Sequence, residues 1–211
     1  MDQPSVPGNT VVLRSFWHAA LLTCGLIGPL IFLVVYFTFG QVSPNFDMLR
    51  QPIGRLELVD YGWIQSANFI VFGLFTCAFA MGLRIELQSG FGVDLIPVFH
   101  ILTALGMITL GVFIHEPAHT YASILMLIPL IASFLLFARR FAGDPRWKGW
   151  AFYSRLCAFT IVILSVSYWY AHHINSPYAG IFEHLLILIR LVWMTVFILK
   201  LLGGQRLTAI A

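Results

Sequence analysis

Six long apolar stretches, separated by short polar segments, run through the 211-residue chain. Each is close to the ~20 residues that an α-helix needs to cross the hydrocarbon core of a bilayer. The pattern predicts an all-α, polytopic membrane protein in which residues 1–211 form a single domain, a bundle of six transmembrane helices. We expect the spans near residues 17–39, 63–84, 94–114, 121–138, 150–172 and 183–202.

The composition supports the same class of protein. Hydrophobic residues make up 59% of the chain, charged residues only 10%, and the mean hydropathy is +0.87. A soluble domain carries about 25% charged residues, so the lipid bilayer is the first expected partner. The net charge of +3 is small and the basic residues form no patch, which argues against a nucleic-acid partner.

Basic residues predict how the chain is oriented, because short cytoplasmic loops are enriched in lysine and arginine. If the N-terminus is cytoplasmic, only Arg50 and Arg55 fall in loops on the other side. The C-terminus is then cytoplasmic as well, and Trp147 and Trp150 are expected at the inner membrane interface. The basic residues expected on the cytoplasmic side are Arg14, Arg84, Arg139, Arg140, Arg146, Lys148, Lys200 and Arg206.

The one sizeable loop, at about residues 40–62, faces outward in this topology. Its leucines and Ile53 alternate with charged residues, a pattern typical of a short segment that lies on the membrane surface. The loop leads into a span that carries Gln65, Ser66 and Asn68. Polar side chains are costly in hydrocarbon, so this end of the bundle is the expected place for a site.

Arg190 is the least expected residue inside a span. It lies seven residues after Glu183, about 10 Å into the last helix. An arginine at this depth is expected to face the bundle or an aqueous cavity. We therefore predict an outward-opening polar pocket with Arg190 at its floor, Asn68 beside it and carboxylates above it. The candidate pocket residues are Arg190, Asn68, Gln65, Glu183, His184, Asp60 and Glu116. The alternative is a purely structural bond from Arg190, without a ligand.

Histidines near the outer ends of the spans suggest a second possibility. His115, His119, His172 and His173 could contribute ligands to zinc, and a zinc-bound water could hydrolyse a lipid ester or amide. Pro117 lies between the first two histidines and disfavours a continuous helix there. No established catalytic motif is present, so the catalytic residues and the cofactor both stay unassigned.

A third possibility is a haem or another pigment held by histidines of neighbouring spans. The inner pair, His18 and His100, differ in their expected depth by ~9 Å, which matches poorly. A bond from His100 to a neighbouring helix is the simpler expectation.

Several short motifs together resemble the bacterial six-span membrane family known as domain of unknown function 998. They are Gly28-Pro29, Gln51-Pro52-Ile53, residues 62–69, residues 78–84, Gly111-Val112-Phe113, residues 138–141 and Gly180-Ile181-Phe182. The resemblance covers residues 28–202 and implies a multi-pass protein of the bacterial inner membrane. The chain departs from the family pattern at Glu116, where an aspartate is usual, and at His184, where an arginine is common. A second histidine that often follows His119 is missing.

These observations favour a binding or accessory module over an enzyme. The expected partner is a lipid, a small amphiphile or other membrane subunits.

Overall fold

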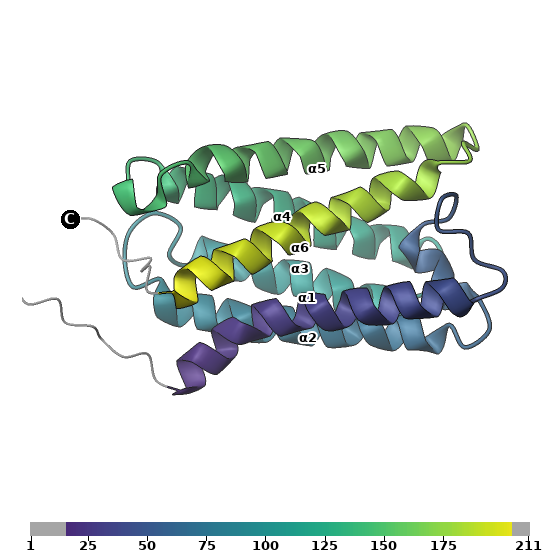
Figure 1. Ribbon diagram of the computed structural model, residues 1–211, viewed down its shortest axis with the longest axis horizontal. Helices are drawn as coiled ribbons and strands as arrows, with labels where there is room; N and C mark the ends of the chain where they lie inside the picture. The colour runs from purple at the N-terminus through teal and green to yellow at the C-terminus, as the bar shows by residue number, and fades with distance from the viewer. Residues whose placement is uncertain (1–15, 204–211) are drawn as a thin grey trace, which may run out of the picture.

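The computed structural model describes residues 16–203 as antiparallel α-helices joined by short connections (Figure 1). The helices are α1 (Phe16–Val42), α2 (Trp63–Glu86), α3 (Leu95–Val112), α4 (Ala118–Phe141), α5 (Trp150–His173) and α6 (Ala179–Leu202). Two short 3₁₀ helices, η1 (Ile53–Leu58) and η2 (Pro145–Trp147), lie in the connections. All six α-helices are long and apolar enough to cross a membrane, which confirms the predicted fold class.

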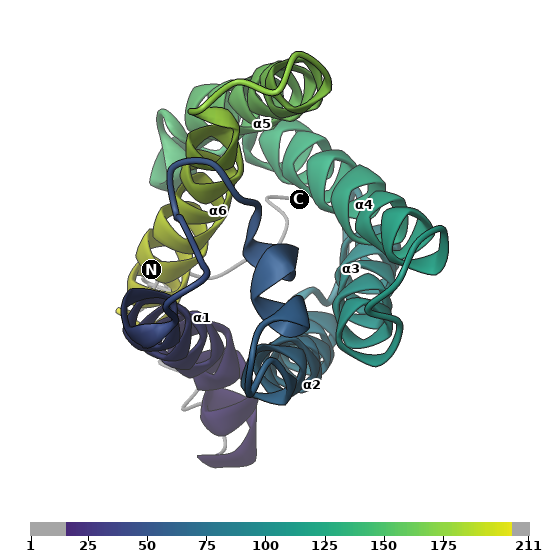
Figure 2. The same cartoon turned by 90° about the vertical axis from the view of Figure 1, so that its right-hand side faces the viewer.

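The helices form a closed ring in chain order, so α6 returns to pack beside α1 (Figure 2). Their alternating direction gives the bundle two different ends. We call the end with residues 43–62, 113–117 and 174–178 the cap end, and the end with residues 87–94 and 142–149 the basic end. The expected cytoplasmic side corresponds to the basic end, and this orientation stays a prediction. Arg14 and Arg206, on which it partly rests, lie outside the described residues.

Glycines allow the first four helices to pack closely. A Cβ atom at Gly82 of α2 would lie 2.9 Å from the backbone nitrogen of Leu22 in α1. A Cβ atom at Gly73 would lie 2.9 Å from the carbonyl oxygen of Ala104 in α3. Small residues let helix backbones approach in this way within membranes.

The connection between α1 and α2 packs on the bundle itself, whereas its sequence predicted a segment that lies on the membrane surface. It folds inward, and η1 lies over the centre of the helix ring (Figure 2). Ile53 and Leu56 are buried and join the apolar core with Phe32 and Phe69. The apolar side of an amphipathic segment needs an apolar surface to pack against, and here the bundle itself provides that surface. We call residues 43–62 the cap.

The tryptophans of the basic end are also more deeply placed than predicted. Trp147 and Trp150 are buried, and their rings pack against Phe141 and Phe197 rather than lining the interface. The turn that contains η2 thus packs its tryptophan ring against the ends of α4 and α6.

Candidate functional site

Helix α6 places Arg190 inside the bundle, as predicted. Its exposed fraction is only 4%, although it lies in the middle of a membrane-spanning helix. One terminal nitrogen, Nη1, donates to the sulfur of Met107 at 3.2 Å, and the other, Nη2, donates to the hydroxyl of Thr76 at 3.4 Å. The guanidinium carbon also lies 4.7 Å from the ring centre of Phe72.

These contacts do not neutralise the charge of Arg190. Within residues 16–203, no carboxylate lies within 4.0 Å of its nitrogen atoms. Its Nε atom is buried and has no hydrogen-bond partner. A thioether and a hydroxyl are weak compensation for a cation removed from water, so Arg190 is an uncompensated buried charge.

Helix α2 lines the same interior with polar groups, because Gln65, Asn68 and Thr76 share its buried face with Phe72. Asn68 donates through Nδ2 to the carbonyl oxygen of Phe32 at 3.1 Å and to Gln65 Oε1 at 3.3 Å. The remaining amide atoms, Gln65 Nε2 and Asn68 Oδ1, are buried without a partner. Asn68 therefore lies one helical turn nearer the cap than Phe72, which contacts Arg190, and the row continues to Thr76.

Two carboxylates, of Glu57 and Glu183, hold the cap over this interior. Glu57 of η1 accepts hydrogen bonds from Ser66 of α2 and His119 of α4, both at 3.1 Å. Glu183 of α6 accepts a hydrogen bond from the backbone nitrogen of Ile53 at 2.6 Å. The cap is thus bonded to three helices of the ring.

Close backbone packing adds to this attachment. The backbone nitrogen of Gly180 donates to the carbonyl oxygen of Leu49 at 2.9 Å. A Cβ atom at Gly180 would lie 2.5 Å from the carbonyl oxygen of Gln51. Glycine is needed here because the cap backbone touches the start of α6.

The other predicted pocket residues lie elsewhere at the cap end. His184 bonds to the Tyr36 hydroxyl and to the Gly180 carbonyl oxygen. Asp60 and Glu116 are exposed, and Glu116 accepts a hydrogen bond from Thr120 at 2.6 Å. The structure therefore buries Gln65 and Asn68 in a row on α2 that ends at the Arg190 contacts Phe72 and Thr76, and it uses Glu183 to hold the cap.

With this geometry established, comparison with known proteins identifies the family. The profile of the family described as "Protein of unknown function (DUF998)" matches residues 26–200. The chain belongs to this family. No curated protein and no solved structure matches the chain. The resemblance seen in the sequence motifs is thus confirmed, and the DUF998 membership supplies no activity of its own.

The candidate metal ligands of this DUF998 protein are dispersed. His115, His172 and His173 are exposed, and His172 and His173 stack on Tyr168 and Trp169. His119 is the exception, because it is bonded to Glu57. Among residues 16–203, no three histidine, cysteine, aspartate or glutamate side chains are grouped so that they could hold a metal ion. The described part of the chain therefore contains no group of side chains that could form the zinc centre of a hydrolase.

The histidines considered for haem each have protein partners. The Nε2 atom of His18 lies 3.2 Å from the carbonyl oxygen of Gly82 and 3.5 Å from a Glu86 oxygen. His100 bonds to the carbonyl oxygen of Ile96 within its own helix, and its ring lies edge-on to Phe79. These bonds hold the imidazoles within the helix packing.

Sequence reasoning missed Glu57, Thr76 and Met107, which complete the interior. Thr76 was detectable, since it falls eleven residues after Gln65 and so on the same face of α2. Glu57 was hidden because its loop was expected at the surface. Met107 carried no signal that distinguishes it from other apolar residues of α3.

Proposed function

We propose that this DUF998 protein is a membrane-embedded binding module for an amphiphile with an acidic group. The observation that supports the proposal is the buried, uncompensated guanidinium of Arg190. In a bilayer, burial of an unpaired charge costs several kcal/mol, so such residues usually serve a function. An anionic group beside Arg190 would restore the missing counter-charge.

Unpaired atoms along this row suggest the chemistry of the ligand. Arg190 Nε and Gln65 Nε2 are donors, and Asn68 Oδ1 is an acceptor. An anion such as a carboxylate or phosphate matches the Arg190 donor, and other polar groups of the same compound match the amides of Asn68 and Gln65, which lie nearer the cap. Apolar side chains, including Phe72 and Leu191, surround this row and suit the hydrocarbon part of an amphiphile.

The proposed route to the site runs through the cap end. There the cap, and not a membrane-spanning helix, covers the end of the ring. Hydrogen bonds to α2, α4 and α6 hold the cap in place. Displacing residues 53–58 would expose the interior from the end that the charge distribution predicts to be non-cytoplasmic. The function as an accessory subunit for other membrane proteins is compatible with this reading, but no observed contact favours it.

The test is mass spectrometry of amphiphiles that co-purify with the protein in mild detergent. We expect the wild type to carry an acidic species whose amount falls at least about tenfold in Arg190→Leu, since charge-assisted hydrogen bonds contribute ~1.5–3 kcal/mol. Arg190→Lys should retain part of it, because the charge remains while the planar donor geometry is lost.

Arg155→Leu is the matched control, because Arg155 lies within the spanning helix α5 but is exposed. Its profile should equal that of the wild type. An unchanged profile in Arg190→Leu, from protein with wild-type helical content, would show that Arg190 is structural and would overturn the proposal.

A further inference from the structure

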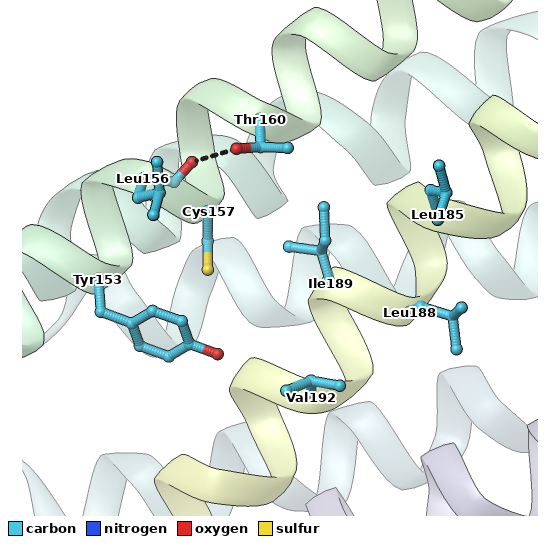
Figure 3. Close-up of a pocket in the computed structure, with 8 residues that line it drawn as sticks. All are labelled: Tyr153, Leu156, Cys157, Thr160, Leu185, Leu188, Ile189 and Val192. Carbon is cyan, nitrogen blue, oxygen red and sulfur yellow. Dashed lines mark hydrogen bonds between the residues drawn. The ribbon is translucent and has the colours of Figure 1, made fainter.

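Helices α5 and α6 leave an apolar groove between them on the outer surface of the bundle (Figure 3). Its volume is about 300 Å³. The lining side chains come from the facing sides of the two helices and are Tyr153, Leu156, Cys157, Thr160, Leu185, Leu188, Ile189 and Val192. The groove is separate from the Arg190 row, since Arg190 points to the opposite, interior side of α6.

The groove contains few polar groups, which are those of Tyr153, Cys157 and Thr160. The Thr160 hydroxyl donates to the carbonyl oxygen of Leu156 at 2.8 Å (Figure 3). The other five lining side chains are leucine, isoleucine and valine. In a membrane-spanning region, this surface suits a hydrocarbon chain.

A cation is held in line with one end of the groove. Lys200 follows Val192 on α6, and its amino nitrogen lies 4.9 Å from the ring centre of Trp147 and 5.5 Å from that of Trp150. Trp150 in turn packs against Tyr153 at the end of the groove, with ring centres 5.6 Å apart. In the described part of the chain, no carboxylate lies within 4.0 Å of Lys200.

The dimensions fit one lipid of a single leaflet. Leu185 to Lys200 spans fifteen residues of helix, about 22 Å. Half of a bilayer's hydrocarbon core is about 15 Å thick, and the headgroup region adds to this. An acyl chain in the groove would thus place its phosphate at the level of Lys200, where lysine commonly reaches the interface.

We propose that the α5–α6 groove binds one acyl chain of an anionic phospholipid, whose phosphate pairs with Lys200. The aromatic rings of Trp147 and Trp150 fix the position of the amino group, and the groove fixes the chain. The negative charge of the lipid complements Lys200, which has no carboxylate partner among residues 16–203. This site is independent of the function proposed for Arg190.

The experiment is native mass spectrometry of the full chain, released from vesicles of equimolar dioleoylphosphatidylglycerol and dioleoylphosphatidylcholine. One phosphatidylglycerol should be retained on the wild type in preference to phosphatidylcholine. Lys200→Gln should reduce this preference by about fivefold, the factor expected for one basic residue at an anionic surface. Lys148→Gln is the control, because Lys148 is an exposed lysine of the same end that does not adjoin the groove.

A second pair of variants tests the groove itself. Val192→Trp fills it and should remove the retained lipid, whereas Val166→Trp, at an exposed position of α5 outside the groove, should retain it. Arg190→Leu should also retain this lipid, which separates the two proposals. Should Val192→Trp fail to fold, the lysine pair still decides.

Equal loss in Lys200→Gln and Lys148→Gln would overturn the proposal, as would wild-type retention in both Lys200→Gln and Val192→Trp. A dimer of the chain that is lost in Val192→Trp would also overturn it, because the groove would then hold a second copy.

Discussion

Arg190 and Lys200 are cations of the same helix, yet α6 places them in different regions of the molecule. Arg190 lies in the interior under the cap, against Phe72, Thr76 and Met107. Lys200 lies near the end of the helix, over the rings of two tryptophans and in line with an open groove. The interior region is polar and enclosed, whereas the groove is apolar and open to lipid.

The difference shows how the cost of a charge depends on its surroundings. A lysine at the end of a spanning helix keeps its amino group near the interface at little cost. The buried guanidinium of Arg190 cannot reach the interface in this way, and its hydrogen-bond acceptors in this bundle are weak. The presence of a buried Arg190 therefore calls for a function. Lys200, at the end of the helix, is tolerated without one.

The largest effect on stability should come from a substitution that pushes the cap away from α6. In Gly180→Ala the new Cβ atom would lie 2.5 Å from Gln51 O and 2.6 Å from Met48 O, both backbone atoms that cannot rotate away. We expect a loss of about 2 kcal/mol in the free energy of unfolding, measured by thermal unfolding in detergent.

The control for this variant is Gly203→Ala at the other end of α6, where the nearest atom would lie at 3.2 Å. It should cost less than about 1 kcal/mol. If the two variants were equally stable, the cap would not be seated on α6 as described.

A smaller effect is expected on the groove side, where a buried bond joins α5 to α6. The indole nitrogen of Trp193 donates to the Ser154 hydroxyl at 3.1 Å. Ser154→Ala leaves the indole N–H buried without an acceptor and should cost about 1 kcal/mol in the same unfolding measurement. Ser165→Ala is matched, because the Ser165 hydroxyl bonds only within its own helix at Ile161, and it should change little. Equal costs would mean that the bond does not hold the two helices together.

The smallest effect concerns the turn that carries Trp147 beneath Lys200. The Asp144 carboxylate accepts hydrogen bonds from the side chain and backbone of Arg146, and these contacts lower the pKa of Asp144. A lowered folded-state pKa means that the contribution is present above the ordinary aspartate value of about 3.9 and is lost as the pH falls through the folded value.

Asp144→Asn should therefore cost less than about 1 kcal/mol at pH 7, because Arg146 is partly exposed, and the difference from the wild type should shrink at acid pH. Unfolding curves at pH 7 and pH 3 check this. A difference that grows on acidification would contradict the role assigned to the ion pair.

The sequence predicted the spans well, because a helix that crosses a bilayer must present apolar residues to lipid and hydropathy measures that property directly. It also predicted that Arg190 faces inward, from the cost of charge in hydrocarbon. It failed at Ile53 and Leu56, because an amphipathic loop has the same pattern whether it rests on lipid or on the end of its own bundle. The partners of Arg190 were unpredictable for a related reason. Met107 and Phe72 are ordinary span residues until packing brings them to the guanidinium.

The measurement that most directly tests the central claim is thermal unfolding of Arg190→Met in delipidated detergent, compared with the wild type. If Arg190 is an uncompensated charge kept for a ligand, the methionine variant is more stable without lipid, by about 1–4 kcal/mol. It should also gain less than the wild type when the acidic fraction of a bacterial lipid extract is added. A variant that is several kcal/mol less stable than the wild type under both conditions would contradict the account, because Arg190 would then be a structural bond of the bundle.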